Sequence, residues 1–401
     1  MSIHDPTEPL TETEGAVRDA AHKFAAEVLR PAGAALDVLQ PDAVIAPDSV
    51  LWDLFRQYQS LGFGRGELTD DGMSPVEAAR VSAIVGEEMG WGDSGLAISL
   101  AVAGMPSLLA RTFGRQDLME RFTTDQIGCW AITEPDHGSD MVDFAGRSRA
   151  PGTDPGRANC IARREGDEIV ITGQKAAWVS NGTIAETAAL FCAFEDEGKA
   201  SGGGVFLVPL NEKAVSRGKP LDKIGQRALN QGEIFFDGLR VPASQMLIGP
   251  ELYDLTIDRV LTMANTGMGS TFVGVARAAL EHAVDYAHER IQGGTAIFEH
   301  QSVKARLFTM FRKVEAARAL NRAVIGYNAT HPEQPRLELA IASKVTSTDS
   351  AFEVASEAVQ IFGGNGLSRE YPVEKLMRDA RASMIEDGCN HVLGLAAADR
   401  L

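Results

Sequence analysis

The 401-residue sequence lacks the patterns that mark metal, disulfide and nucleic-acid proteins. Its four cysteines form no CxxC pair and its eight histidines no HExxH pattern, so we expect neither a disulfide framework nor a metal site. No apolar run reaches the roughly 20 residues that cross a bilayer. The net charge is −17 without a basic block, which argues against nucleic acid and anionic membranes as partners.

The two ends of the given sequence match no targeting signal. The first residues, MSIHDPTEPLTETEG, are polar and acidic, unlike a secretory signal or an Arg-rich transit peptide. The last residues, AADRL, match no peroxisomal signal. We therefore expect a cytoplasmic protein.

What the sequence does contain is a change of texture along the chain. Apolar residues at helical spacing fill the first part, short β-rich runs with many glycines follow, and the helical period then returns. The predicted class is α+β multidomain. It comprises an N-terminal helical domain (1–127), a small antiparallel β-barrel or sandwich (128–243) and a C-terminal four-helix-bundle-like domain (244–401).

Two local patterns predict details of the helices. Pro31 is expected to end the first helix. Residues 250–291 predict one helix of about 40 residues. Its middle is rich in Ala, Gly and Ser, so neighbouring helices can approach it closely.

The stretch WAITEPDHGSD, Trp130 to Asp140, stands at the entry to the β segment. Its small and hydroxyl residues with Gly138 suit a loop whose N–H groups face an anion or a flat heteroaromatic ring. An ordinary Pro-Asp and Gly-Ser turn explains the same letters, and spacing alone does not choose.

In GQKAAWVSNG, Trp178 is expected to end a strand with Ser180 two residues on, so that both share a face. An aromatic slab beside a hydroxyl suits a planar cofactor, whereas a core Trp before an NG turn is the plainer interpretation.

The stretch from Gln360 to Arg381, QIFGGNGLSREYPVEKLMRDAR, predicts a helix that ends at a glycine pair, a turn, and a new helix at Pro372. Its glycines allow close backbone approach to a ligand or another subunit. No GxGxxG follows a strand here, so a Rossmann site is not supported.

Taken together, TEPDHGSD, GQKAAWVSNG, YAHERIQGG…FEHQ and FGGNGLSREYPVEKLMRDA resemble the acyl-CoA dehydrogenase family, in the family's order and over nearly the whole chain. The resemblance implies FAD and removal of two hydrogens from an acyl thioester. A carboxylate takes the α-proton and the β-hydrogen leaves as hydride to flavin N5. It also implies acyl-CoA as substrate, an electron-transfer flavoprotein as acceptor, and a homodimer or homotetramer.

The resemblance assigns roles to individual residues. The flavin-contacting loop matches Trp130, Ala131, Ile132, Thr133, Gly138 and Ser139, with Trp178 flanking the ring and Ser180 near N5. The FAD phosphates and adenosine, held largely by a neighbouring subunit, match Arg290, Gln301, Gln360, Gly363 and Gly364. Cys389 and His391 replace a Thr and a Gln beside FAD. Substrate contacts match Ser139, Arg259 and Gly388.

The catalytic base departs from the family pattern. In IEDGCN, Asp387 stands where most members have Glu, and Glu386 replaces the preceding aromatic. A second set of members keeps its base just before the conserved Arg, which here is Asp258 before Arg259. Asp is one methylene, about 1.5 Å, shorter than Glu. Asp387 is our first candidate, then Glu386, then Asp258; a solvated helix end and an Asp–Arg pair are the plainer interpretations.

Three functions remain open at this level. The first is an acyl-CoA dehydrogenase, or a dehydrogenase of an acyl group on a carrier protein, since both carry the same phosphopantetheine arm. The second is a flavin-dependent monooxygenase or oxidase on the same fold. The third is a binding protein with a degenerate site.

Overall fold

The computed structural model describes residues 10–62, 72–142 and 156–401. The first helical part contains α1 (Glu12–Phe24), a π-helical turn (Ala25–Leu29), α2 (Arg30–Asp37), α3 (Pro41–Val44), α4 (Val50–Ser60), α6 (Pro75–Gly92), α7 (Ser94–Ala103), α8 (Met105–Thr112) and α9 (Gln116–Arg121).

The strands of the β domain are β1 (Gly128–Ala131), β2 (Cys160–Glu165), β3 (Glu168–Lys175), β4 (Thr187–Asp196), β5 (Lys199–Pro209), β6 (Val215–Arg217), β7 (Ile234–Pro242) and β8 (Met246–Ile248). The last part contains α10 (Tyr253–Glu289), the short pair β9 (Ile291–Gln292) and β10 (Thr295–Ala296), α11 (Gln301–Thr330), α12 (Leu337–Phe362), α13 (Val373–Ser383) and α14 (Asn390–Ala398).

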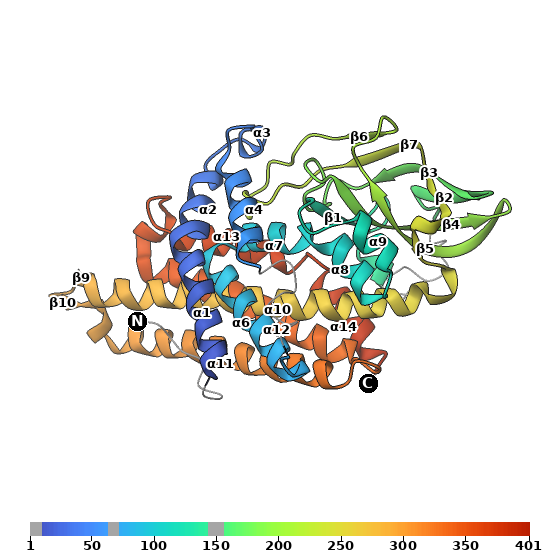
Figure 1. Ribbon diagram of the computed structural model, residues 1–401. Helices are drawn as coiled ribbons and strands as arrows, with labels where there is room; N and C mark the ends of the chain where they lie inside the picture. Colours follow the sequence, from blue (N-terminus) through green and yellow to red (C-terminus); the bar gives the residue numbers. More distant parts are fainter. Residues whose placement is uncertain (1–9, 63–71, 143–155) are drawn as a thin grey trace.

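The predicted order of helices, strands and helices is confirmed, and Figure 1 shows the β domain at one end of the long C-terminal helices. The eight strands form one sheet in the order β6-β7-β3-β2-β4-β5-β8, with β1 also paired to β4. The β domain begins with β1 at Gly128. Its last strand, β8, ends at Ile248, beyond residue 243.

The expectation of an antiparallel β domain is wrong for two strand pairs. Both β1 and β2 run parallel to β4. The connection 176–186 takes the chain from the end of β3 to the far side of β2, where β4 runs antiparallel to β3 and therefore parallel to β2. Since β3 separates β2 from β4 in the chain, two reversals of direction make β2 and β4 parallel.

The prediction that Pro31 ends the first helix is also wrong. Helix α1 continues through the π-helical turn into α2, and Pro31 lies in the first turn of α2. A proline is tolerated there because the wider π turn interrupts the regular hydrogen-bond ladder just before it.

The predicted long helix is confirmed as α10, with 37 residues. Its small residues permit close crossings with α6, as expected. A Cβ added to Gly274 would lie 2.0 Å from the Glu87 carbonyl oxygen, and one added to Gly90 would lie 1.9 Å from that of Thr271. The backbones of α6 and α10 are therefore in contact at Gly90 and at Gly274.

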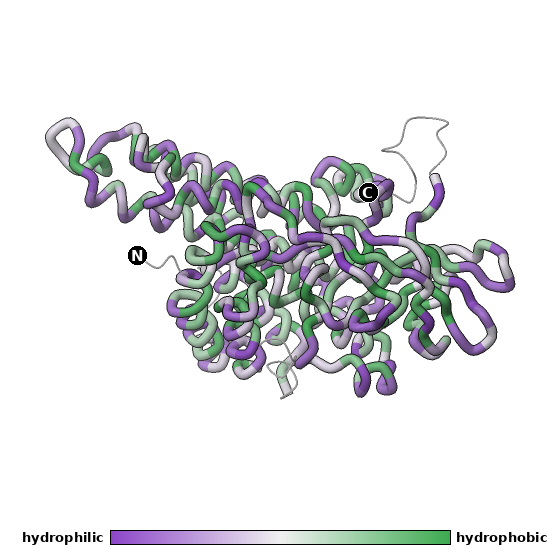
Figure 2. The backbone as a smooth tube through the Cα atoms, turned by 90° about the horizontal axis from the view of Figure 1, so that it is seen from above, coloured by the Kyte–Doolittle hydropathy of each residue, from purple (hydrophilic) through white to green (hydrophobic). Residues whose placement is uncertain are grey.

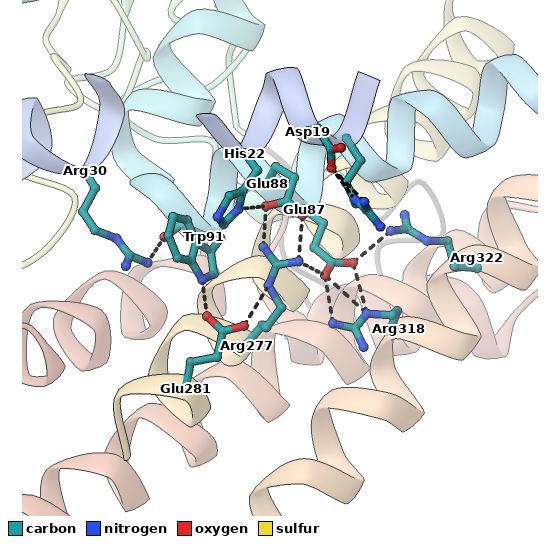
Figure 3. Close-up of polar contacts among 11 residues, drawn as sticks. Asp19, His22, Arg30, Glu87, Glu88, Trp91, Arg277, Glu281, Arg318 and Arg322 are labelled. Carbon is teal, nitrogen blue, oxygen red and sulfur yellow. Dashed lines mark hydrogen bonds and ion pairs between the residues drawn. The ribbon is translucent and has the colours of Figure 1, made fainter. Parts of the chain in front are cut away.

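A buried ionic cluster lies beside this crossing (Figure 3). Glu87 accepts hydrogen bonds from Arg277, Arg318 and Arg322, and Arg277 also pairs with Glu88. The cluster thus ties the N-terminal helices to α10 and α11.

Within the described residues, no single helix is long and apolar enough to cross a bilayer. Only the bent helix pair α7–α8 has the combined length and apolar composition of a membrane span.

Candidate active site

The loop after β1 is fixed in place by a buried ion pair. The ammonium group of Lys175, at the end of β3, pairs with Glu134 at 2.6 Å and donates to the carbonyl oxygens of Ile132 (3.0 Å) and Phe191 (2.6 Å). The Thr133 carbonyl accepts from the Ala176 amide. Glu134 is therefore structural, and it holds the following loop through Ser139 against the β domain.

The second loop follows β3 and differs from the expectation. The strand ends at Lys175, so Trp178 lies in a turn and only Ser180 makes a single β-bridge, with Gln231. The left-handed Asn181 (φ 61°), bonded to Ser99 of α7, turns the chain here. The Trp178 side chain is 60% exposed, so it is not a core Trp.

The third loop carries the two carboxylates between α13 and α14. Asp387 (φ 50°) and Gly388 (φ 97°) are both left-handed, and the Asn390 amide closes the loop on the Met384 carbonyl. Burial raises the pKa of Glu386 to about 7 and also raises the pKa of Asp387. Both carboxylates are half-buried in this loop, so the interpretation as a fully solvated helix end is wrong.

Four hydrogen bonds bring these loops together. The Cys389 amide donates to the Ser139 hydroxyl at 3.0 Å, which joins the loop after β1 to the carboxylate loop. The Gln226 side chain donates to Glu386 at 2.8 Å, and Gln226 belongs to the loop before β7. Gln231 of that same loop donates to the Trp178 carbonyl (3.2 Å) and the Ser180 hydroxyl (3.3 Å).

Two lysines, the half-buried Lys223 and the buried Lys344, lie near the carboxylates without pairing to them directly. Lys223 donates to the Leu229 carbonyl and the Gln231 side chain, and Lys344 donates to the Gly388 carbonyl and the Asn390 side chain. Burial lowers the pKa of each lysine to about 8, against the opposing attraction of the nearby acids.

The third candidate base, Asp258, is paired with an arginine. Both oxygens of Asp258 accept from Arg400, at 2.8 and 2.9 Å. This is the Asp–Arg pair that was the plainer interpretation of Asp258. Its neighbour Arg259 is half-buried, and among the described residues its Nε has no hydrogen-bond partner, so this guanidinium retains a donor for an anionic group.

The residues matched to the FAD phosphates and adenosine lie apart from these loops. Arg290 follows the C-terminal end of α10, and at about 1.5 Å per residue a 37-residue helix spans about 55 Å. The set is exposed at the end of the bundle opposite the β domain (Figure 1): Arg290, Gln301, Gln360, Gly363 and Gly364. His391 is also exposed, whereas Cys389 is half-buried next to Ser139.

Sequence reasoning missed four polar residues of the site: Gln226, Gln231, Lys223 and Lys344. Three of them come from KIGQRALNQG, a loop with no motif, and the signal was only its density of amide and ammonium groups beside glycines. Lys344 is a fully buried lysine in a helix face of small residues.

The residues present fit a flat heteroaromatic cofactor. The Trp178 indole offers an open face with a hydroxyl two residues on, and the indole N–H of Trp130 is buried without a partner in the described part of the chain. Indole rings combine an apolar face with a donor. Across residues 10–62, 72–142 and 156–401, no group of His, Cys, Asp and Glu could hold a metal ion, and the four cysteines are free.

Comparison with known proteins places this arrangement in a family. Residues 129–239 match "Acyl-CoA dehydrogenase, middle domain" and residues 255–401 match "Acyl-CoA dehydrogenase, C-terminal domain". The chain is 30% identical over 296 residues to the short-chain specific acyl-CoA dehydrogenase of Homo sapiens mitochondria, covering 72% of this chain and 67% of that protein. It is 30% identical over 400 residues to benzylmalonyl-CoA dehydrogenase of Aromatoleum aromaticum, covering 97% and 98%.

Solved structures agree. Butyryl-CoA dehydrogenase from Megasphaera elsdenii superposes with a TM-score of 0.85 at 26% identity, over 98% of this chain and 99% of that one. A glutaryl-CoA dehydrogenase from Mycobacterium smegmatis in complex with FADH2 shares the fold, with a TM-score of 0.82 at 21% identity over 98% and 95%. In sequence and in fold, this chain belongs to the acyl-CoA dehydrogenase family.

Proposed function

We propose that this protein binds FAD and dehydrogenates an acyl-CoA between its α and β carbons, with Asp387 as the base. Family membership supports the reaction class. The observation that carries the proposal is the hydrogen bond from the Cys389 amide to Ser139. It holds the half-buried carboxylates of the C-terminal bundle against the loop that the family resemblance matches to flavin.

The chain's own residues supply binding, orientation and a proton acceptor. Trp178 and Ser180 would lie against the isoalloxazine, with Trp130 and the loop through Ser139 along it. When bound, FAD supplies the hydride acceptor. Arg259 would donate a hydrogen bond to an anionic part of the substrate, because its Nε is buried without a partner among the described residues.

The structure favours a base from the loop between α13 and α14 over Asp258, which is engaged by Arg400. Burial raises the pKa of Asp387, which brings a weak carboxylate base closer to the pH of the reaction. Among the described residues, no side chain donates a hydrogen bond to Asp387, whereas Glu386 is engaged by Gln226. Asp387 is thus the carboxylate with its oxygens available to a substrate proton.

The test is anaerobic bleaching of the flavin by a panel of acyl-CoA and acyl-carrier thioesters. Wild-type protein should bleach with at least one of them. Asp387→Asn should slow bleaching by about 100-fold or more, the usual contribution of a general base. Glu386→Gln is the matched variant. If it abolishes bleaching while Asp387→Asn does not, the base is Glu386.

The remaining features of this proposal follow from the family resemblance. We propose an electron-transfer flavoprotein as acceptor, a homodimer or a homotetramer built from two dimers as the assembly, and the cytoplasm as the location. Stopped-flow reoxidation of the reduced protein by a purified electron-transfer flavoprotein tests the first. If oxygen consumption with NAD(P)H and product hydroxylation is found instead, the chain is a monooxygenase.

A further inference from the structure

Glu386 and Asp387 are adjacent, half-buried carboxylates without a direct cationic partner in the described part of the chain. The nearby lysines donate their hydrogen bonds to other groups. Lys223 donates to Leu229 and Gln231, and Lys344 donates to Gly388 and Asn390. Two neighbouring carboxylates that are partly shielded from water repel each other when both are ionised, so one of them tends to keep a proton.

The side chain that faces Glu386 is an amide with one half unused. Gln226 is 1% exposed, and its Nε2 donates to Glu386 Oε2 at 2.8 Å. Its Oε1 is buried and has no hydrogen-bond partner in the described residues. A buried acceptor left unpaired is costly, so a proton donor next to it is stabilised.

The orphan acceptor and the carboxyl group match each other. The N and O of an amide share one carbon, as do the two oxygens of a carboxyl group, and a protonated carboxyl has one O–H donor and one C=O acceptor. A protonated Glu386 can therefore accept from Nε2 and donate to Oε1 of the same amide. An ionised Glu386 can make only the first of these bonds.

The Gln226 backbone is held so that this amide stays in place. Its N–H donates to Asp379 of α13, its φ is 49°, and Arg378 donates to the carbonyl of Ile224, two residues earlier, at 2.7 Å. Asp379 in turn pairs with Lys375. Two consecutive residues of α13 thus lock the loop that carries Gln226.

We propose that Gln226 is a positioning residue which holds Glu386 as a neutral acid through a two-point acid–amide pair. Asp387 is then the one negative charge of the pair. The inference rests on the proposed function only for the role of Asp387 as base. The α-proton goes to Asp387, and the proton of Glu386 stays in the acid–amide pair throughout. The charged groups around Glu386 are Lys223, Lys344 and Asp387.

The experiment is infrared difference spectroscopy of the FAD-loaded protein without substrate, titrated between about pH 5 and about pH 9, the range in which a buried carboxyl group of raised pKa titrates. Wild type should show the carbonyl stretch of a protonated carboxylic acid at neutral pH, and Glu386→Gln, which removes that acid, assigns the band. In Gln226→Leu the band should move to higher frequency, because its C=O no longer accepts a hydrogen bond.

Gln57→Leu, at an exposed glutamine of α4, is the control and should leave the band unchanged. Gln226→Met serves as a second substitution if the leucine variant does not fold. The proposal is overturned if wild type shows no Glu386-dependent band at neutral pH, or if that band is the same in the Gln226 variants. If the band behaves as expected but no thioester bleaches the flavin, the proposed function fails and the pair stands.

Discussion

At the scale of single residues, the surroundings of the carboxylate loop are polar but contain few direct ion pairs. Lys344 holds the loop by its Gly388 carbonyl and its Asn390 side chain, at 2.9 and 2.7 Å. Burial raises the pKa of Asp387, and the charge of Lys344 opposes that rise. One lysine therefore both shapes the loop and favours the ionised form of its carboxylate.

Replacing Lys344 by methionine should shift the pH dependence of flavin reduction. Without the ammonium group the pKa of Asp387 rises further, so a higher pH is needed to ionise the base. The acid limb of the profile should move to higher pH. Anaerobic stopped-flow reduction across pH measures this.

Lys199→Met, at an exposed hairpin position, is the control for loss of a lysine. An unchanged acid limb in Lys344→Met would show that Lys344 does not influence the ionisation of the base.

At the scale of elements, α6, α10 and α11 are joined by the ionic cluster around Glu87 (Figure 3). Burial alone would raise the pKa of Glu87, but Arg318, Arg277 and Arg322 together lower it to about 2. A folded-state pKa below the unfolded value stabilises the fold above the ordinary carboxyl range. This contribution is present at neutral pH and is lost as the pH falls toward 2.

Arg318→Leu should destabilise the protein by about 3–5 kcal/mol, because removing one partner leaves Glu87 charged and less compensated in the interior. Thermal unfolding at neutral pH, followed by circular dichroism, measures the loss. The difference from wild type should shrink in acid, where Glu87 becomes protonated.

Arg312→Leu, on an exposed face of the same helix α11, should change stability by about 0.5 kcal/mol or less. Equal losses in the two variants would mean that the cluster contributes nothing beyond an ordinary surface arginine.

At the scale of the whole molecule, the α10–α11 hairpin end projects from the body (Figures 1 and 2). This part of the molecule and the nearby turn after α12 expose large apolar side chains: Ile291 (62%), Phe308 (65%), Phe311 (40%) and Leu367 (77%). Exposed apolar surface of this kind is typical of an interface. The residues matched to the FAD phosphates and adenosine lie at the same end, which favours a cofactor site shared between two protomers.

A complementation experiment tests the shared site. Arg290→Gln should weaken FAD binding about tenfold or more, since charge-assisted hydrogen bonds to phosphate are strong. In a two-fold dimer whose sites each combine Arg290 of one protomer with Asp387 of the other, coexpression of Arg290→Gln with Asp387→Asn restores some intact sites. Half of the dimers are mixed and one of their two sites is intact, so about a quarter of wild-type activity should return.

Lys199→Gln in place of Arg290→Gln is the control for the loss of a positive charge. A coexpressed pair with no more activity than the separate variants would place Arg290 and Asp387 in the same protomer's site, or would remove Arg290 from the site.

Much of the architecture could be predicted from local pattern. The period of apolar residues gave the long helix α10, and the four short motifs identified the family before any contact was known. Strand direction could not be predicted in this way. Whether β2 and β4 run parallel depends on the path of residues 176–186, and side-chain alternation is the same in both arrangements.

Local pattern likewise predicted only some residues of the site. Motifs pointed to Trp178, Ser139 and the carboxylates, but no pattern in KIGQRALNQG indicated that Gln226 would meet Glu386, 160 positions along the chain. That Asp258 would pair with Arg400 could equally be stated only as one possibility.

The sequence by itself determined which residue types and which helical and strand segments this protein has, because spacing and turn chemistry act between neighbours in the chain. Only the tertiary structure decided which acid pairs with an arginine, which accepts from an amide and which is open to a proton. Burial and pairing arise between segments that only folding brings together, and they set the pKa of each carboxylate.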